Sequence, residues 1–278
     1  MNAKGKFFLL FVLGFLLKAC ATSPSLTPTS TPSILSGKLT FAGSTTMQPL
    51  AERLSQVFRE DNPLVQFEIA AGGSKVGINA VHEGTADIGM SSRALSAEEE
   101  EGIQVYTVGL DALAIIVHPQ NTINGLTLEQ LRDIYWGKIT NWKEVGGADL
   151  PIIPIQREIS SGTRGAFDEI VLEKVEASAP NLQTVVTAGD VASAVAQQEG
   201  SIGYVGFGNL EQNVRLIAIN EVIPSPETII AGSYNLYRPL SFLTGPLSNP
   251  LAEIFIQFVL SEEGQRYITE FGWIPVNR

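Results

Sequence analysis

A change from a strand pattern to a helix pattern is centred on the sequence Arg157-Glu158-Ile159-Ser160-Ser161-Gly162-Thr163-Arg164-Gly165-Ala166-Phe167. The apolar run over residues 152–156 favours a strand, and residues 163–174 have a helical pattern. A Ser-Gly-Thr turn that opens a helix presents hydroxyls and unpaired N–H groups to one point, where the helix dipole adds positive potential. We therefore expect an anion site here, because a guanidinium four residues upstream supplies a planar, charged partner. Its expected ligands are Arg157, Ser161, Gly162 and Thr163.

Two further polar turns occur in the same strand-to-helix setting. The first, Gly43-Ser44-Thr45-Thr46, lies between an expected strand over residues 38–42 and an expected helix over residues 47–59. The second, Gly72-Gly73-Ser74-Lys75, follows a run typical of a strand at residues 65–70. Taken alone, each turn is typical of an ordinary helix start or tight turn. Parallel α/β sheets, however, bring such turns together at the carboxyl edge of their strands. The three turns together therefore predict a site that holds a tetrahedral oxyanion.

Asp87 begins another short expected strand, over residues 87–90, just ahead of Ser91-Ser92-Arg93. A carboxylate beside an anion can accept a hydrogen bond from a protonated phosphate, whereas fully ionised sulfate would face it as a like charge. Asp87 is therefore a candidate proton acceptor that would reject sulfate. The alternative is that Asp87 only caps local N–H groups at the end of a strand.

Composition excludes several classes of function. The chain has 278 residues, of which 44% are hydrophobic and 17% are charged, which is typical of a globular protein. Its net charge of −11 argues against nucleic acid as a partner, because binding to a phosphate backbone needs basic patches. An acidic protein can still bind an anion where neutral donors are aligned locally.

The sequence does not favour an enzyme. It has two histidines, His82 and His118, and no His-Glu-x-x-His, Gly-x-Ser-x-Gly or Walker-type motif. No local base would activate a serine nucleophile. We therefore expect neither a catalytic residue nor a metal or cofactor. A cell-surface phosphatase, a phosphate sensor or adhesin, and a receptor for another oxyanion such as molybdate or tungstate remain as alternatives.

The N-terminus has the pattern of an export signal. Lys4 and Lys6 precede an apolar run over residues 7–17 that is too short for an ordinary transmembrane helix. Leu17-Lys18-Ala19-Cys20 resembles a bacterial lipobox, so residues 1–20 are expected to form the signal peptide and lipobox, with Cys20 as the lipidated first residue of the mature protein and cleavage after Ala21 as the alternative. Residues 21–36 are rich in Ser, Thr and Pro and predict a flexible linker. The expected location is periplasmic or on the outer face of the cell membrane, with a lipid anchor.

From Gly37 onward, strand and helix patterns alternate, which predicts an α/β fold with mainly parallel sheets. Helices are also expected at residues 75–83, from the Thr127 capping box to about Tyr135, at residues 191–198 with Asp190 as N-cap, and at residues 251–268. The remaining strands are expected at residues 113–117, 184–187, 202–205 and 216–219.

These motifs resemble the phosphate-binding proteins of bacterial phosphate ABC transporters, which belong to the class of periplasmic binding proteins. The resemblance covers nearly all of residues 37–278. Its stretches are Ala42-Gly43-Ser44-Thr45-Thr46-Met47-Gln48-Pro49-Leu50, Gly72-Gly73-Ser74, Ala86-Asp87-Ile88-Gly89-Met90-Ser91-Ser92-Arg93, Tyr135-Trp136-Gly137-Lys138-Ile139-Thr140-Asn141-Trp142, Arg157-Glu158 with Ser161-Gly162-Thr163-Arg164, and Gly200-Ser201-Ile202-Gly203-Tyr204-Val205.

The resemblance implies a protein that holds inorganic phosphate between two lobes and delivers it to an ABC permease, as a monomer. Lobe 1 would hold residues 37–111 and 234–278, and lobe 2 residues 112–233, with crossovers near Asp111 and Tyr234 as the hinge. Some members of the family carry an acidic residue at the position of Ile159, where it pairs with the arginine that corresponds to Arg157. In this chain Arg157 would therefore lack an acidic partner, unless Glu158 turns inward. The implied phosphate ligands are Ser44, Thr45, Thr46, Ser74, Asp87 as proton acceptor, Arg157, Ser161, Gly162 and Thr163.

Overall fold

The computed structural model describes Met1, residues 35–247 and residues 249–276. The expected signal segment, Cys20 and nearly all of the linker therefore lie outside the described residues. Within the part that is described, none of the helices is both long and apolar enough to span a bilayer. Residues 34–278 form one unit, which carries all the contacts discussed below.

The first lobe begins with two β-α-β units that share one parallel sheet. Strand β1 pairs with β2 on one side and β3 on the other, and Gly43 lies opposite both Ala71 and Met90. The carboxyl ends of these three strands consequently meet at one edge of the sheet. The elements are β1 (Ser36–Gly43), α1 (Gln48–Asp61), β2 (Leu64–Ala71), α2 (Ser74–His82) and β3 (Ile88–Ser91).

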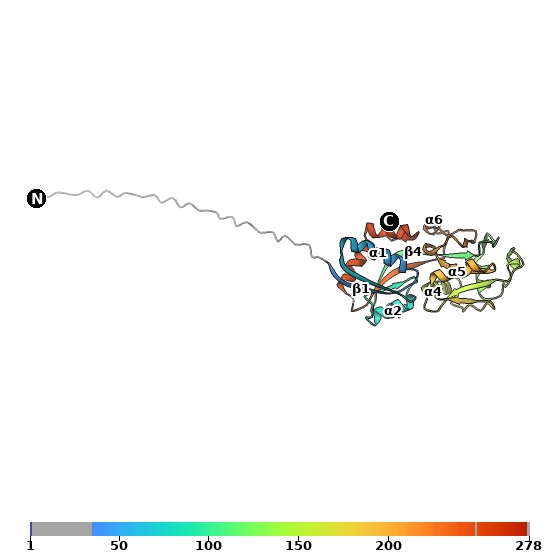
Figure 1. The fold of residues 1–278 in the computed structure, drawn as a ribbon, viewed down its shortest axis with the longest axis horizontal. Coiled ribbons are helices and arrows are strands. Elements are labelled where there is room, and N and C mark those ends of the chain that lie inside the picture. The colour runs from blue at the N-terminus through green and yellow to red at the C-terminus, as the bar shows by residue number, and fades with distance from the viewer. Residues whose placement is uncertain (2–34, 248, 277–278) are drawn as a thin grey trace. The chain divides into compact units, whose positions relative to one another are not determined.

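Two long antiparallel strands, β4 (Gln104–Val117) and β11 (Tyr237–Thr244), connect the lobes. The strand order is β2-β1-β3-β11-β4-β8-β6-β7. The first half of β4 pairs with β11, and its second half pairs with β8. Figure 1 shows the consequence, since the blue N-terminal and red C-terminal segments share one lobe while the green and yellow middle of the chain forms the other.

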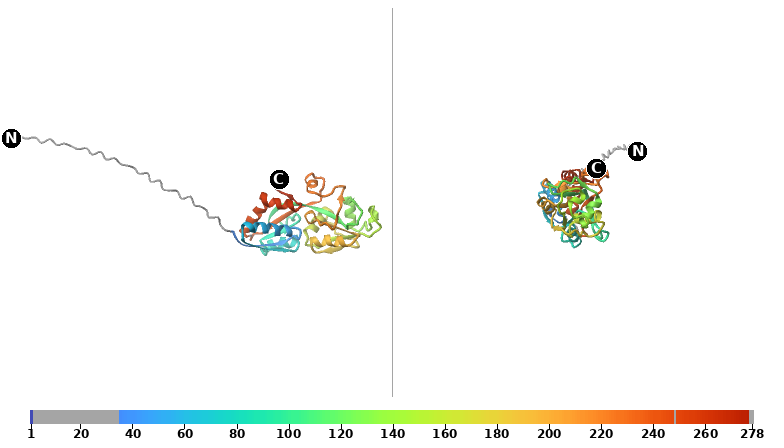
Figure 2. Two further views of the ribbon diagram at one scale, coloured as in Figure 1. Left: turned by 45° about the horizontal axis from the view of Figure 1, so that its top comes forward. Right: turned by 90° about the vertical axis from the view of Figure 1, so that its right-hand side faces the viewer.

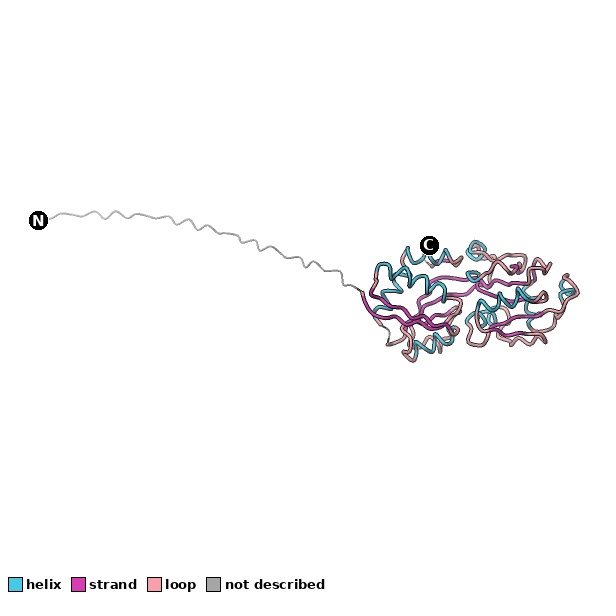
Figure 3. The backbone as a smooth tube through the Cα atoms, viewed as in Figure 1, coloured by secondary structure: helices cyan, strands magenta, loops and turns pink. Residues whose placement is uncertain are grey.

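The second lobe repeats the pattern of parallel strands and helices, with β6 between β7 and β8. Figure 3 shows strands running through the middle of both lobes, with helices and loops around them. The elements of this lobe are β5 (Gly125–Leu126), α3 (Leu128–Tyr135), β6 (Ile153–Arg157), α4 (Gly162–Ile170), β7 (Gln183–Val185), α5 (Ala188–Gln197), β8 (Ser201–Gly206), β9 (Arg215–Leu216), β10 (Ala218–Ile219) and α6 (Pro226–Ile230). The chain ends in the first lobe with α7 (Pro250–Leu260), α8 (Glu262–Glu270) and β12 (Ile274–Pro275).

Each lobe has its own hydrophobic core, and the division falls within β4, where Val108 belongs to the first core and Ala112 to the second. The left view of Figure 2 shows the two lobes end to end. In the first core, Phe255 packs edge-on against Phe41 and Phe58, with ring centroids 5.4 Å apart in both pairs. In the second, Phe167 and Tyr204 stack with centroids 3.9 Å apart.

The predicted two-lobed α/β fold is confirmed, with parallel strands inside each lobe and antiparallel pairing at the crossovers. The prediction of one helix over residues 251–268 is wrong. Ser261 has an extended backbone and caps α8 by accepting from Gly264 N at 3.3 Å, so the run is divided into α7 and α8.

Other local predictions need smaller corrections. The N-cap of α5 is Thr187, and Asp190 occupies the third helical position of a capping box. Helix α4 ends at Ile170, four residues earlier than expected. The strand expected over residues 216–219 is two short strands, β9 and β10, with Ile217 between them. The strand expected over residues 113–117 is only the last part of β4, and no pattern had predicted β11.

The packing of the aromatic core predicts how much stability is lost when one of its rings is removed. We expect Phe255→Ala to lower the free energy of unfolding by about 3–5 kcal/mol, because it removes a fully buried ring and leaves a cavity among other rings. Denaturant unfolding followed by circular dichroism measures the loss. The neighbouring Ile254 is 41% exposed, so Ile254→Ala is the matched control and should cost far less. Equal losses for both variants would contradict the assigned core.

Candidate functional site

The first two polar turns are joined through the backbone where β1 ends. The carbonyl of Gly43 accepts hydrogen bonds from Gly72 N and Gly73 N, both at 2.9 Å. Gly43 has φ of 133°. A Cβ there would lie 3.0 Å from Met90 N and would overlap Met90 O, so only glycine fits. This close approach brings the ends of β1, β2 and β3 together.

Five buried hydroxyls gather at this edge, and we call them the hydroxyl cluster. Ser44 Oγ donates to Ser92 Oγ at 2.9 Å. Ser92 N donates to Ser74 Oγ at 3.0 Å, and the two serine hydroxyls are 3.4 Å apart. The Thr46 and Thr163 hydroxyls lie 3.1 Å apart. All five side chains are at most 2% exposed: Ser44, Thr46, Ser74, Ser92 and Thr163.

Helix α4 of the second lobe points its N-terminus at the hydroxyls of the first lobe. Ser161 is its N-cap and accepts from Arg164 N at 3.3 Å. Gly162 follows, and a Cβ there would overlap Ser74 Oγ and lie 2.7 Å from Ser92 Oγ. The absence of a side chain at Gly162 therefore allows the N–H groups of this helix to approach the cluster closely.

Arg157 ends β6 and is only 1% exposed. Its guanidinium donates to Val186 O at 2.7 Å and to Thr45 Oγ1, in the other lobe, at 3.1 Å. Burial lowers the pKa of the Arg157 guanidinium, and the carboxylate of Glu158 opposes that shift. Arginine nevertheless stays protonated, because its pKa begins far above neutral. A fixed positive charge thus lies against the first polar turn.

Ser160 closes the edge of this region by bridging the two lobes. Its hydroxyl donates to Gly72 O at 2.7 Å, and its carbonyl accepts from Lys75 N at 3.1 Å. Glu158 turns toward Ser160, accepting from its hydroxyl at 2.8 Å, and lies 3.8 Å from the Arg157 guanidinium. Arg157 therefore has an acidic neighbour in Glu158, while the Ile159 side chain is 73% exposed.

The arrangement suits a small anion. The N-termini of α2 and α4 and the turn before α1 meet at the hydroxyl cluster, so the helix dipoles add to the charge of Arg157. Hydroxyls in a buried site can turn their protons toward bound oxygen atoms. A tetrahedral oxyanion would find donors from both lobes around it.

The structure brings together all the predicted ligands except Asp87. That residue lies at the amino end of β3, not at its carboxyl end, and its neighbour in the sheet is β1. Its carboxylate accepts from Thr40 N at 2.8 Å and from Thr40 Oγ1 at 2.7 Å. Thr40 lies in β1, four residues before Ser44. At the usual rise of a strand this places the Thr40 backbone roughly 13 Å from the start of the first polar turn. The capping alternative therefore describes Asp87, and its carboxylate does not face the cluster.

Ser92 occupies the position at the carboxyl end of β3 that the sequence reasoning had assigned to no ligand. The rule that selected Ser44 and Ser74, a polar residue just after a parallel strand, also selects Ser92 once β3 is seen to end at Ser91. Asp87 does not satisfy this rule, because it lies at the amino end of β3. The sequence pattern alone could therefore have identified Ser92.

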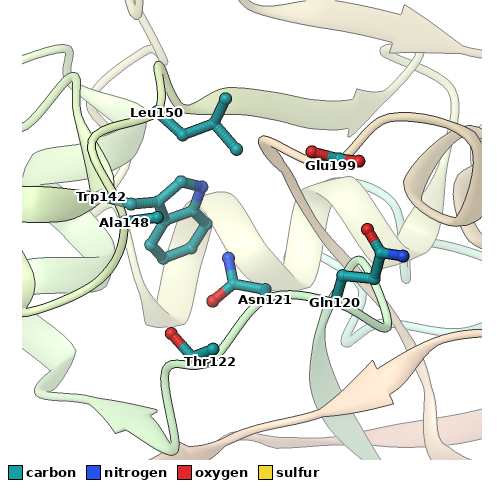
Figure 4. A pocket seen from close by; sticks show the side chains of 7 residues that line it. All are labelled: Gln120, Asn121, Thr122, Trp142, Ala148, Leu150 and Glu199. Atoms are coloured by element: carbon teal, nitrogen blue, oxygen red, sulfur yellow. The ribbon is translucent and has the colours of Figure 1, made fainter.

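A cavity beside Trp142 lies apart from this site. A cavity of about 150 Å³ in the second lobe lies between the Gln120 loop and Trp142, and Figure 4 shows its mixed lining. It shares no residue with the hydroxyl cluster, and the Trp142 indole is buried and donates to Gly200 O at 2.9 Å, which is a packing role. Among residues 35–247 and 249–276, no group of three or more His, Cys, Asp or Glu side chains is placed to hold a metal ion.

Comparison with known proteins agrees with this geometry. Residues 27–263 match the PBP superfamily domain. The chain is 34% identical to the phosphate-binding protein PstS of Bacillus subtilis over 248 residues, which cover 87% of this chain and 81% of that protein.

Solved structures give the same result. A phosphate ABC transporter substrate-binding protein of Clostridium perfringens, with bound phosphate, is 37% identical with a TM-score of 0.83, covering 87% of this chain and all of that one. An ABC-type phosphate transport receptor of Vibrio cholerae is 32% identical with a TM-score of 0.72, covering 85% of this chain and 99% of its own.

The loop that follows Ser92 predicts a pH dependence of stability. Arg93 binds both carboxylate oxygens of Glu99 at 2.7 Å, and these hydrogen bonds lower the pKa of Glu99 from 4.5 to about 2. Because the folded pKa is depressed, the stabilisation is complete above the unfolded pKa and is lost as the pH falls from about 4.5 to about 2. Glu99→Gln should therefore be less stable than the wild type near pH 6, and the difference should shrink through that window.

Urea unfolding at several pH values measures this difference. Glu263 is the matched control, because it is largely exposed and its ion pair with Arg266 spans 4.0 Å, so Glu263→Gln should differ little from the wild type at any pH. A Glu99→Gln difference that stays constant down to about pH 2 would show that the ion pair does not hold this loop.

Proposed function

This chain belongs to the bacterial phosphate-binding proteins of the PBP superfamily, and we propose that it captures inorganic phosphate between its two lobes and delivers it to an ABC transporter permease. The observation that carries this proposal is the contact of the α4 N-terminus with buried hydroxyls of the other lobe. Ligands from both lobes mean that one anion can hold the lobes together.

The proposed ligands divide by lobe and by chemistry. The first lobe contributes hydroxyls and N–H groups, and the second contributes a guanidinium and a helix N-terminus. Closure of the lobes would remove water from around the anion, which strengthens each hydrogen bond. The proposed set is Ser44, Thr45, Thr46, Ser74, Ser92, Arg157, Ser161, Gly162 and Thr163.

The same proposal includes the boundaries of the two lobes, the location of the protein and its oligomeric state. We take residues 37–111 with 234–278 as lobe 1 and residues 112–233 as lobe 2. The change of core between Val108 and Ala112 supports the first crossover, whereas Tyr234 and Leu236 pack in the second core, so the return crossover is better placed after Leu236. The protein would be exported, tethered through a lipid on Cys20, and act as a monomer. The curated relatives that it matches are named as binding proteins, and we propose no catalytic activity.

Calorimetric titration with phosphate tests the function, after carried-over ligand has been removed by unfolding and refolding. We expect a dissociation constant in the micromolar range or below, or about −8 kcal/mol or better. Sulfate and molybdate are titrated in parallel. No heat with phosphate from folded protein, or tighter binding of molybdate, would refute the proposed ligand.

Gly162→Ala tests the site within that function. Its Cβ would overlap Ser74 and push the α4 N-terminus away, so we expect binding to weaken by about 1–3 kcal/mol, or roughly 5- to 150-fold. Gly189 is the matched control, because it also lies in the first turn of a helix but has nothing within 4 Å of the position that a Cβ would occupy. Gly189→Ala should bind phosphate as the wild type does, and equal affinity in both variants would place the anion elsewhere.

Asp87 and Ser92 give opposite expectations. Asp87→Asn should lower stability by about 1 kcal/mol, because it weakens the contacts with Thr40, yet leave phosphate affinity within about twofold. Ser92→Ala should weaken binding by about 1.5–3 kcal/mol, since it removes a hydroxyl beside a charged ligand. Calorimetry and thermal melting of both variants check this pair. A large loss of affinity in Asp87→Asn would restore that carboxylate to the site.

A further inference from the structure

A second buried guanidinium lies directly behind the hydroxyl cluster. Arg238 on β11 is paired with Asp111 on β4, its direct neighbour in the antiparallel register. The Arg238 Nε and Nη2 atoms lie 3.2 Å and 2.9 Å from the same Asp111 oxygen, and both side chains are about 1% exposed. An ion pair so fully buried is costly unless its remaining donors are also satisfied.

The remaining donors of Arg238 reach two members of the hydroxyl cluster. Nη2 donates to Thr46 Oγ1 at 3.4 Å, and Nη1 donates to Ser92 O at 3.0 Å. One planar group therefore holds both the turn after β1 and the residue after β3. Lysine could not copy this, because its ammonium is a single point on a flexible stem.

The contact with Thr46 has a directional consequence. A hydroxyl whose oxygen accepts from a guanidinium has its proton free to donate elsewhere. For Thr46 the Thr163 hydroxyl of the other lobe is within reach, 3.1 Å away. The contact from Arg238 thus leaves the Thr46 proton able to donate to Thr163 or to a bound anion.

The second lobe also touches this ion pair. A Cβ on Gly206, at the end of β8, would overlap the Asp111 carboxylate and lie 2.8 Å from Arg238 Nη2. Gly208 N lies 3.5 Å from the other Asp111 oxygen. The pair is therefore enclosed by both lobes, where a small displacement of the guanidinium would change the cluster.

We propose that Arg238 is a positioning residue of the anion site, which acts through Thr46 by fixing that hydroxyl as a donor, while Asp111 holds the guanidinium in place. This inference rests on the proposed capture of phosphate and adds a residue that need not touch the anion itself. A purely structural role would affect stability alone, whereas a positioning role requires energetic coupling between Arg238 and Thr46.

A double-mutant cycle on phosphate affinity tests the coupling, using the purified full chain and the variants Arg238→Lys, Thr46→Val and the double variant. We expect Arg238→Lys and Thr46→Val each to weaken binding by about tenfold, because Thr46→Val removes a hydroxyl that donates to a charged ligand and Arg238→Lys removes the guanidinium contact that orients this hydroxyl. The double variant should bind no more weakly than Thr46→Val, since Arg238 acts through that hydroxyl. Independent, multiplying losses would overturn the proposal, as would unchanged affinity in Arg238→Lys.

Two controls keep the result interpretable. Arg215 also donates to backbone carbonyls, including Asn121 O at 2.6 Å, but lies away from the cluster, so Arg215→Lys should leave affinity unchanged. If Arg238→Lys does not fold, Gly206→Ala replaces it in the cycle, because it displaces the guanidinium without removing the charge. A wild type that binds no phosphate refutes the proposed function and this inference together, whereas normal wild-type binding with an uncoupled cycle refutes the inference alone.

Discussion

The antiparallel pairing of β4 with β11 is the interaction on which both lobes depend. β4 continues from the first core into the second, and β11 lies between it and β3. Backbone hydrogen bonds along this pair fix the register, and a slip of one residue would turn every side chain to the opposite face. Such a slip would separate Arg238 from Asp111 and move the end of β3 relative to α4. The geometry of the anion site is thus set by strands that contribute none of its proposed direct ligands.

Features that depend on a few neighbouring residues could be predicted from the sequence. The turns at Ser44, Ser74 and Ser161 were recognised because glycine and hydroxyl residues between a strand and a helix have limited conformational choices. Their convergence followed from the rule that parallel strands end at one edge, and the contacts between Thr46 and Thr163 agree with it. Local pattern and simple topology together therefore identified most of the candidate site.

What could not be predicted depends on partners far away in the chain. β11 carries a proline and mixed polar residues, and only its neighbours β3 and β4 make it a buried strand. The importance of Arg238 arises from a contact 192 residues away, to which no local motif points. Asp87 was predicted for a different reason, which was the chemistry of a carboxylate beside a protonated anion. The geometric rule, a polar residue just after a parallel strand, selects Ser92 instead. The division at Ser261 did have a local signal, because a serine followed by Glu262 and Glu263 is typical of a helix start, but the prediction extended the apolar pattern of α7 past it.

The position of β11 in the sheet also governs the order in which the molecule can be assembled. A chain that emerges from the ribosome with its N-terminus first presents β3 and β4 long before residue 244 exists, so their facing edges have no partner. Most of the second lobe comes from one continuous segment between β4 and β11, so most of its core can form earlier, although Ile274 joins that core last. The first lobe must wait for its last strand, which gives it the higher contact order and the slower folding step. Late completion therefore leaves the first lobe as the part of the molecule that stays open longest during synthesis.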